Sequence, residues 1–399
     1  MINNIHKLRD KINKWLYIND DEWLDIILAC SLDRKIMGEP IWLFIIAVPS
    51  GSKTEILRAF KEGEDFFHIS SLTANSFVSG YTYLEKKKTK KVEDLATQID
   101  GKCLILKDFT SILSMAKEKR DEIIGQFREL YDGSYEKKFG NIDKKVRINS
   151  KFGLLAGVTP KIDKYYTLMG QLGERFLKLR SDFDDEKMLE LCDYNEGKEI
   201  QMRSEIGKAT MDFYNSVKIR DVTFNHDDIV ELKKAAQFIA KIRAPDYSRW
   251  DRDGCVEHIP VKAEKSPRVY KQIKKLCKAL CCVHGLTSPN KMIIERIWRV
   301  ARDSSPPDRL MVWDCILKKG SINQGIITSE TGMPKTSVMR ILKVLQNVEL
   351  IKGVYNDVHT NEYWANKKYV PLCIFSGTKS QEINRQYVPK IDLTEETVE

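Results

Sequence analysis

The stretch from Phe44 to Leu57, FIIAVPSGSKTEIL, carries the residue types of a phosphate-binding loop. In such loops a lysine reaches the outer phosphates of a nucleotide and the next hydroxyl residue holds Mg²⁺, roles that Lys53 and Thr54 could fill. The usual pattern, G-x-x-x-x-G-K-[ST], would place glycines where this chain has Ala47 and Ser52. Two interpretations are open: a loop that cradles a phosphate, or a serine-rich turn that ends in Lys-Thr.

If the loop holds a phosphate, its backbone N–H groups converge on the ligand and the following helix adds its N-terminal end. One glycine, Gly51, remains to adopt a positive φ angle, and serine is small enough to leave the phosphate unobstructed. The residues expected to bind the nucleotide are Pro49, Ser50, Gly51, Ser52, Lys53, Thr54 and Glu55.

Further polar residues follow other apolar runs. Asp108 ends CLILKDF and could coordinate Mg²⁺ together with Thr54, or orient the attacking water, although Lys107 precedes it where a second acid is usual. Thr159 ends FGLLAGVTP and could contact the γ-phosphate or the water. Arg175, in LGERFLKLR, could reach a neighbouring subunit's nucleotide and stabilise transition-state charge. The alternative is that these are the solvated ends of buried strands.

The elements that position these residues follow from apolar patterning. PIWLFIIAV, KCLILKDF and KFGLLAGVTP are short, continuous apolar runs, and helical patterns from Thr54 to Glu62 and in MAKEKRDEIIGQFRELYD separate them. Buried strands that alternate with helices predict an α/β protein with a parallel sheet. Residues 1–37 are predicted to be helical, as is most of 186–303, with polar loops such as RAPDYSRWDRDG. After SSPPDR, a predicted linker, three helices and a hairpin are expected.

These pieces together resemble AAA+ P-loop ATPases, and within them the branch of the minichromosome-maintenance (MCM) helicases and related phage and mobile-element proteins. LKDFTSILSMAKEKRDEIIGQFRELYDGSYEKKFG resembles the acidic strand, helix and hairpin of that branch, and SKFGLLAGVTP is similar to its sensor strand, with Thr159 for the usual asparagine. LGERF resembles the segment of the arginine finger, which points to Arg175. SPRVYKQIKKLCKAL resembles a lid helix with a second sensor arginine, here Arg268.

The resemblance implies a fold, an activity and a set of partners. It implies a P-loop AAA+ parallel sheet with a helical lid, followed by a C-terminal winged helix. The corresponding ranges are an N-terminal helical segment (1–37), an ATPase core (38–185), a lid (186–303), a winged-helix domain (304–375) and a flexible tail (376–399). It also implies ATP hydrolysis with ATP and Mg²⁺ bound, a hexameric ring of identical chains, and DNA, single-stranded or as a forked duplex, as the partner.

Two lysine-rich segments could contact DNA if the chains form a ring. Their candidate residues are Lys86, Lys87, Lys88, Lys90 and Lys91 in EKKKTKKVED, and Lys137, Lys138, Lys144 and Lys145 in EKKFGNIDKKVR. Lysines neutralise phosphates without reading sequence, which makes binding salt-sensitive. Runs of lysine are otherwise an ordinary solvated surface.

The C-terminal unit contains a pattern typical of a recognition helix. In ITSETGMPKTSVMRILKVL the apolar residues after Pro334 fall on one face, which leaves an outward face for DNA made of Lys335, Thr336, Ser337, Arg340 and Lys343. The hairpin that follows would be the wing. Winged helices also bind proteins, so this alternative stays open.

Composition limits the class of protein. The net charge of +9, from 66 Lys and Arg against 57 Asp and Glu, favours an anionic partner, with nucleic acid first. No apolar run is long enough for a membrane span and the start has no signal-peptide pattern, so a cytoplasmic protein without a membrane partner is expected. Nine irregularly spaced cysteines are expected to be reduced. The group Cys277, Cys281, Cys282 and His284 is expected to serve packing, with a zinc site as the alternative.

Three functional hypotheses follow from the sequence. The first is an ATP-dependent DNA helicase or translocase in the replication of a phage or mobile element. The second is a replication initiator or helicase loader that uses ATP as an assembly switch and does not unwind DNA. The third is a transcription regulator whose ATPase core has lost nucleotide binding.

Overall fold

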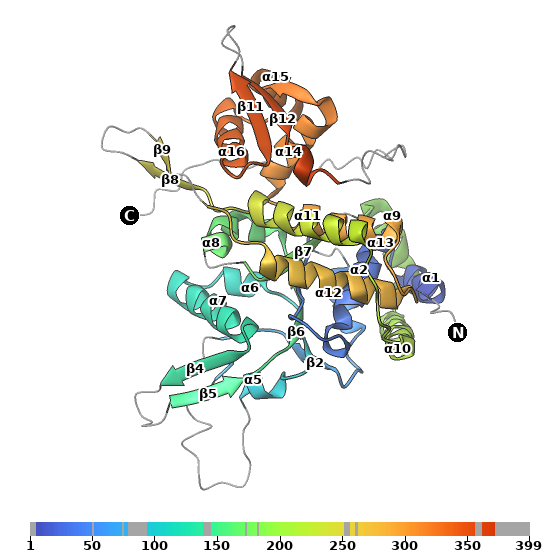
Figure 1. Cartoon of the computed structure of the whole chain (residues 1–399). Helices are drawn as coiled ribbons and strands as arrows, with labels where there is room; N and C mark the ends of the chain where they lie inside the picture. The colour runs from blue at the N-terminus through green and yellow to red at the C-terminus, as the bar shows by residue number, and fades with distance from the viewer. Residues whose placement is uncertain are drawn as a thin grey trace.

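The computed structural model of the chain describes residues 5–49, 52–73, 76–78, 94–138, 145–171, 174–181, 183–250, 256–259, 262–355 and 361–371. A five-stranded sheet forms the centre (Figure 1), with the order β2-β3-β6-β1-β7 and only parallel neighbours. Its strands are β1 (Trp42–Ile46), β2 (Phe66–Ile69), β3 (Cys103–Leu106), β6 (Gly153–Val158) and β7 (Phe176–Arg180). The predicted α/β class with a parallel sheet is confirmed.

β6, which precedes Thr159, lies beside the loop strand β1, and β3 lies beyond β6. The sheet differs from the sequence prediction at both edges. The outer strands β2 and β7 were not predicted. In β7 the charged Lys178 interrupts the apolar pattern, yet it is buried and pairs with Glu174 at 3.2 Å, which makes a charged residue compatible with a buried position.

Alternate side chains of the strands enter two separate core layers. Leu43 and Ile45 of β1 pack with the N-terminal and lid helices, whereas Trp42, Phe44 and Ile46 pack on the opposite face. This period of two, with apolar residues at every position, is what a strand buried on both faces requires.

On the second face lie α5 (Leu95–Gln98), α6 (Thr110–Leu113), α7 (Lys117–Tyr131), η2 (Pro160–Tyr165) and α8 (Tyr166–Gln171). The predicted hairpin after α7 is present as β4 (Ser134–Lys138) and β5 (Lys145–Asn149), which are antiparallel. α7 ends before Gly133, whose φ of 92° suits glycine.

On the first face lie α1 (Ile5–Trp15), α2 (Asp21–Ser31), η1 (Asp33–Lys35) and the helices of the predicted lid. Those helices are α9 (Asp185–Asn195), α10 (Glu199–Ser216), α11 (His226–Ile242), α12 (Pro267–Val283) and α13 (Lys291–Asp303). The segment predicted as a polar loop instead includes an antiparallel hairpin, β8 (Tyr247–Trp250) and β9 (Val256–Ile259). Cys277, Cys281 and Cys282 are completely buried, which confirms that they pack in the core.

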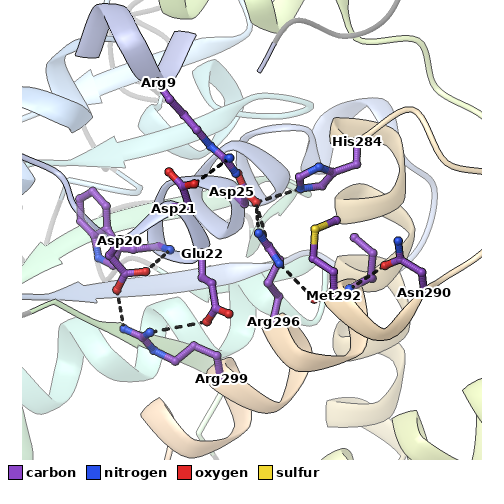
Figure 2. A network of polar contacts seen from close by, with 12 residues as sticks. Arg9, Asp20, Asp21, Glu22, Asp25, His284, Asn290, Met292, Arg296 and Arg299 are labelled. Atoms are coloured by element: carbon purple, nitrogen blue, oxygen red, sulfur yellow. Dashed lines mark hydrogen bonds and ion pairs between the residues drawn. The ribbon is translucent and has the colours of Figure 1, made fainter. Parts of the chain in front are cut away.

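A buried ionic network joins the N-terminal helices to α13 (Figure 2). The carboxylate of Asp25 on α2 is fully buried and accepts hydrogen bonds from Arg9 Nη2 on α1 at 2.5 Å and from Arg296 Nε on α13 at 2.7 Å. His284 Nε2, just after α12, lies 2.8 Å from the same carboxylate. One carboxylate therefore ties the two N-terminal helices to α13 and the end of α12, which lie more than 250 residues further along the chain.

The C-terminal unit lies above these helices in Figure 1 and consists of three helices and a three-stranded antiparallel sheet. Its elements are α14 (Pro307–Lys319), β10 (Ser321–Asn323), α15 (Gln324–Thr331), α16 (Lys335–Asn347), β11 (Ile351–Tyr355), β12 (Asn361–Ala365) and η3 (Lys367–Tyr369). The three predicted helices and the hairpin are confirmed. Ser304 and Ser305, in the predicted linker, are buried, so this junction is packed. None of the helices in the described ranges combines the length and the apolar composition needed to cross a lipid bilayer.

Candidate nucleotide site

The segment after β1 lies at the carboxyl edge of the sheet, where β1 stands between β6 and β7. The chain runs from β1 to the edge strand β2, returns through β3 and β6, and then crosses β1 to reach β7. In open α/β sheets ligands bind outside the carboxyl ends of the strands, where the strand order reverses. The loop between Ile46 and Lys53 is therefore at the position where this fold holds ligands.

The loop has an unusual backbone at Ser52. This residue has φ 54° and ψ −10°, the left-handed conformation that residues other than glycine and asparagine rarely adopt. The sequence pattern expects a glycine at this position, and the backbone takes the conformation of a glycine although the residue is serine. The expectation that only Gly51 would adopt a positive φ was therefore incomplete; Gly51 and Ser50 lie outside the described residues.

Lys53 starts α3 (Lys53–Arg58) and its side chain folds back over the loop. Its Nζ donates hydrogen bonds to the carbonyl oxygens of Ala47, at 3.2 Å, and Val48, at 3.0 Å, which occupy two of its three N–H donors. The residue is 7% exposed, and burial lowers the pKa of its ammonium group, while the negative charge of Asp108 raises it. Lys53 thus places a positive charge at the loop, within electrostatic reach of Asp108.

Asp108 and Thr159 are joined by a residue that the sequence did not single out. Asp108 Oδ1 accepts a hydrogen bond from the backbone N–H of Thr110 at 2.8 Å. Thr110 Oγ1 accepts from the backbone N–H of Thr159 at 3.0 Å and lies 3.3 Å from Thr159 Oγ1. The spacing Asp-x-Thr after a buried strand, which is typical of a side-chain-capped turn, could have indicated this link.

A glycine in β6 holds these residues close together. A Cβ atom on Gly157 would lie 2.5 Å from the carbonyl oxygen of Lys107, so only glycine allows the end of β3 to approach β6 this closely. The backbone N–H of Phe109 also donates to the carbonyl oxygen of Gly157 at 2.7 Å. These contacts fix the position of Asp108, whose side chain is exposed at the edge.

A cavity of about 370 Å³ adjoins the loop. One wall is made of residues 52–55, and the opposite wall is mostly apolar. The lining residues are Trp15, Leu16, Tyr17, Ser52, Lys53, Thr54, Glu55, Met188, Leu191, Cys192, Asn195, Glu199 and Met202. We call this space the loop cavity. Thr54 lies on its wall, whereas Glu55, predicted to contact nucleotide, pairs with Arg58 at 2.7 Å and Arg203 at 3.0 Å.

Asn195 on α9 is one of the polar residues of this mostly apolar wall, together with Glu199. Its Nδ2 donates to the backbone carbonyl oxygen of Trp15 at 2.8 Å, and that acceptor fixes the orientation of the amide because only the nitrogen can donate. Its Oδ1 is buried and has no hydrogen-bond partner within the described ranges. Sequence reasoning missed Asn195 because nothing near it in the chain suggests the loop.

The two predicted arginines lie elsewhere. Arg175 precedes β7 and Arg268 starts α12, both near the amino edge of the sheet, opposite the loop. The side chain of Arg175 is 11% exposed and pairs with Asp132 of the same chain at 3.0 Å, while Arg268 bonds Glu264 at 2.5 Å. Neither arginine belongs to the site formed by Lys53, and the predicted action of Arg175 on a neighbouring subunit would require its pair with Asp132 to break.

The predicted DNA-contacting residues are only partly described. Lys86, Lys87, Lys88, Lys90, Lys91 and Lys144 lie outside the described residues, and Lys137, Lys138 and Lys145 lie on strands β4 and β5. On α16 the predicted buried face is confirmed: Val338, Ile341, Leu342 and Leu345 are buried. Lys335, Thr336 and Lys343 are exposed and Ser337 is half-buried. Arg340, also half-buried, lies 3.4 Å from Asp246 before β8.

Comparison of the chain with protein-family models and with curated protein sequences finds no match.

Proposed function

We propose that this chain is a DNA-binding ATPase of the AAA+ type that resembles the MCM branch and works as a helicase or translocase in the replication of a phage or mobile element. The observation that carries the proposal is the position of Lys53. Its ammonium group bonds two loop carbonyls beyond the carboxyl end of β1, beside the loop cavity and within reach of Asp108. A fixed positive charge there is suited to a triphosphate.

The composition of the site supports a Mg²⁺–nucleotide ligand. Mg²⁺ is commonly held by one or two protein ligands together with phosphate oxygens and waters, so the hydroxyl of Thr54 and the carboxylate of Asp108 are a sufficient set. The described residues contain no cluster of three or more acidic, cysteine or histidine ligands, which is consistent with a metal ion that arrives with phosphates. When bound, the ion would neutralise phosphate charge.

The loop cavity supports an aromatic base as part of the ligand. Its apolar wall, with Trp15, Met188 and Met202, suits a flat aromatic ring. A nucleotide with its base against this wall and its phosphates at Lys53 is therefore favoured.

The C-terminal unit supports a DNA-binding role. Its order of elements, helix, strand, two helices and two strands, with α16 exposing Lys335 and Lys343, is that expected of a winged helix with a recognition helix. The pair between Arg340 and Asp246 holds one predicted DNA contact against the hairpin region, so Arg340 would have to exchange this carboxylate for a phosphate.

The test of the nucleotide site is Lys53→Ala. Loss of a charge-assisted contact of about 1.5–3 kcal/mol should weaken binding of a fluorescent ATP analogue with Mg²⁺ on the order of 10- to 100-fold. Lys218→Ala, which removes an exposed lysine after α10, should bind within twofold of wild type. Equal affinities of wild type and Lys53→Ala would end the proposal.

The second candidate, an ATP-switched initiator or helicase loader, is favoured by one observation. At the end of β3 a lysine, Lys107, precedes Asp108, so this position supplies a single carboxylate where ATPases of this type use two. A single carboxylate is suited to binding the metal ion alone, and is less suited to binding the metal ion and activating the attacking water together. ATP-dependent displacement of a forked duplex favours the helicase, and ATP-dependent binding without displacement favours the switch.

A further inference from the structure

A second hollow lies on the other side of α3 from the loop cavity. Its volume is about 820 Å³, more than twice the 370 Å³ of the loop cavity. It is bounded by α3 and the turn after it, by α10, and by the residue that follows β3. Five of its lining residues are basic: Arg58, Lys61, Lys107, Arg203 and Lys208. We call this hollow the basic groove.

The positive charge of the basic groove is only partly compensated. Glu62 and Asp212 line it, and Arg58 and Arg203 both pair with Glu55, so three acidic residues stand against five basic ones. Lys61, Lys107 and Lys208 have no ion-pair partner within the part of the chain that the structure describes, and Lys61 and Lys208 are exposed. Such an arrangement concentrates positive potential in a concave surface, where field lines are focused.

A histidine on β2 lies within electrostatic reach of two of these lysines. Burial lowers the pKa of the His68 imidazole, a backbone hydrogen bond at Phe60 raises it, and the positive charges of Lys107 and Lys61 lower it.

The shape of the groove leaves room along α10. The residues that α10 contributes between its basic side chains are small, Ser204 and Gly207. A Cβ atom on Gly207 would meet no atom closer than the carbonyl oxygen of Ala59, at 3.8 Å. The groove contains no aromatic residue, so it offers charge without a surface on which bases could stack.

We propose that the basic groove binds the phosphodiester backbone of a nucleic acid strand, independently of its sequence. Lysines and arginines that converge without aromatic partners neutralise phosphates but do not read bases. The inference rests on the proposed function for its nucleic-acid partner, and it adds a binding surface that the lysine-rich loops and α16 do not include.

The groove shares a wall with the nucleotide site. Glu55 lines the loop cavity, while its partners Arg58 and Arg203 line the groove. Arg203 holds Glu55 through two contacts, Nε to Oε2 at 3.0 Å and Nη2 to Oε1 at 3.2 Å. A phosphate that draws Arg203 into the groove competes with Glu55, the residue next to Thr54. Strand binding and nucleotide binding are therefore coupled, and the coupling is reciprocal.

The test uses charge reversal in the groove and a matched control. Lys61→Glu/Lys208→Glu alters two exposed groove lysines, and Lys218→Glu/Lys233→Glu makes the same change in net charge at exposed positions outside the groove. Fluorescence anisotropy measures the affinity for a labelled oligonucleotide at several salt concentrations. Lys61→Gln/Lys208→Gln repeats the test with a milder change in case the reversal disturbs folding.

We expect the groove variants to weaken oligonucleotide binding at least tenfold and to reduce the slope of log K against log salt by about 2, roughly 1 per lysine. The control should change affinity by less than threefold. Equal losses in the groove variant and the control would overturn the proposal, as would wild-type affinity in the groove variants. Inorganic triphosphate as competitor identifies a simple anion site: if it binds the groove and no oligonucleotide does, the proposal is also overturned.

The affinity for an ATP analogue is measured on the same variants. If wild type binds the analogue and the oligonucleotide but the groove variants lose neither, the groove inference fails and the proposed function stands. If wild type does not bind the analogue, the proposed ATPase fails, whatever the result for the groove.

Discussion

Replacement of Asp25 by asparagine should destabilise the fold by about 3–5 kcal/mol, the usual cost of removing one partner from a buried ion pair. The carboxylate is fully buried, and the side chains of its partners Arg9 and Arg296 are only 10% and 7% exposed. An amide has nearly the same volume, so no cavity forms, but it cannot compensate two guanidinium groups. Against a total stability of about 5–15 kcal/mol, such a loss is large.

Other contacts of Arg9 and Arg296 place the expected loss of stability in the lower half of the range of about 3–5 kcal/mol. Arg9 Nη1 keeps its contact with Asp21 at 2.9 Å, and Arg296 Nη1 keeps the carbonyl oxygen of Met292 at 3.1 Å. Neither arginine is therefore left without an acceptor when Asp25 is neutralised. We expect a loss of about 3 kcal/mol.

The assay is equilibrium unfolding in urea followed by circular dichroism, with Asp21→Asn as the control. Asp21 pairs with the same Arg9 but is 56% exposed, so its loss should cost less than about 1 kcal/mol. If Asp25→Asn and Asp21→Asn were equally stable, burial would not determine the strength of this network and the reasoning would be refuted.

The difference in stability between wild type and Asp25→Asn has a predictable pH dependence. Burial on its own would raise the pKa of Asp25, but the hydrogen bond and charge of His284, the charge of Arg296 and the hydrogen bond from Arg9 together lower it below its ordinary value of 3.8. A lowered folded-state pKa gives stabilisation that is complete above the unfolded-state pKa and is lost as the pH falls through the folded-state pKa. The part of the stability advantage over Asp25→Asn that comes from the Asp25 charge should therefore be lost in acid, below about pH 4.

Two further substitutions test the loop. Ser52→Gly should stabilise the protein by about 0.5–1 kcal/mol in the same unfolding assay. A left-handed conformation costs an L-residue ~1–2 kcal/mol, and the greater flexibility of glycine in the unfolded chain offsets part of that gain. An equal gain in Ser52→Ala would contradict the backbone explanation. Gly157→Ala should cost about 1–3 kcal/mol and weaken binding of a Mg²⁺–ATP analogue, because its Cβ would meet the carbonyl oxygen of Lys107 at 2.5 Å and shift Asp108. Wild-type affinity in a folded Gly157→Ala protein would show that the position of Asp108 does not matter for binding.

Continuous apolar runs made the centre of the fold predictable. β1, β3 and β6 are buried on both faces, so their sequences are apolar at every position and differ clearly from the helices around them. β7 was missed because Lys178 and Arg180 interrupt its pattern; their partners, Glu174 and Asp163, are found only in the folded chain. The hairpin of β8 and β9 was missed because its sequence, rich in charge, resembles a surface loop.

The candidate site was predictable where its residues follow strands. Asp108 and Thr159 follow apolar runs closely and Lys53 follows one after a short loop, and the ends of parallel strands meet at one edge. Thr110 and Asn195 could not be placed in this way. Thr110 acts through hydrogen bonds to Asp108 and Thr159, and Asn195 reaches the loop cavity only because α9 packs beside the end of α1.

The charged candidate residues lie at opposite edges of the sheet. Lys53, Asp108 and Thr159 lie at the carboxyl edge, and Arg175 lies before β7 at the amino edge. The five residues of β7 span roughly 13 Å at ~3.3 Å per step, so one chain cannot bring Arg175 to its own loop. Within the proposed function, a single chain can bind nucleotide, but transition-state charge must be met by a second chain whose Arg175 has left Asp132. The pair between Arg175 and Asp132 would then keep the arginine bound within its own chain until subunits assemble.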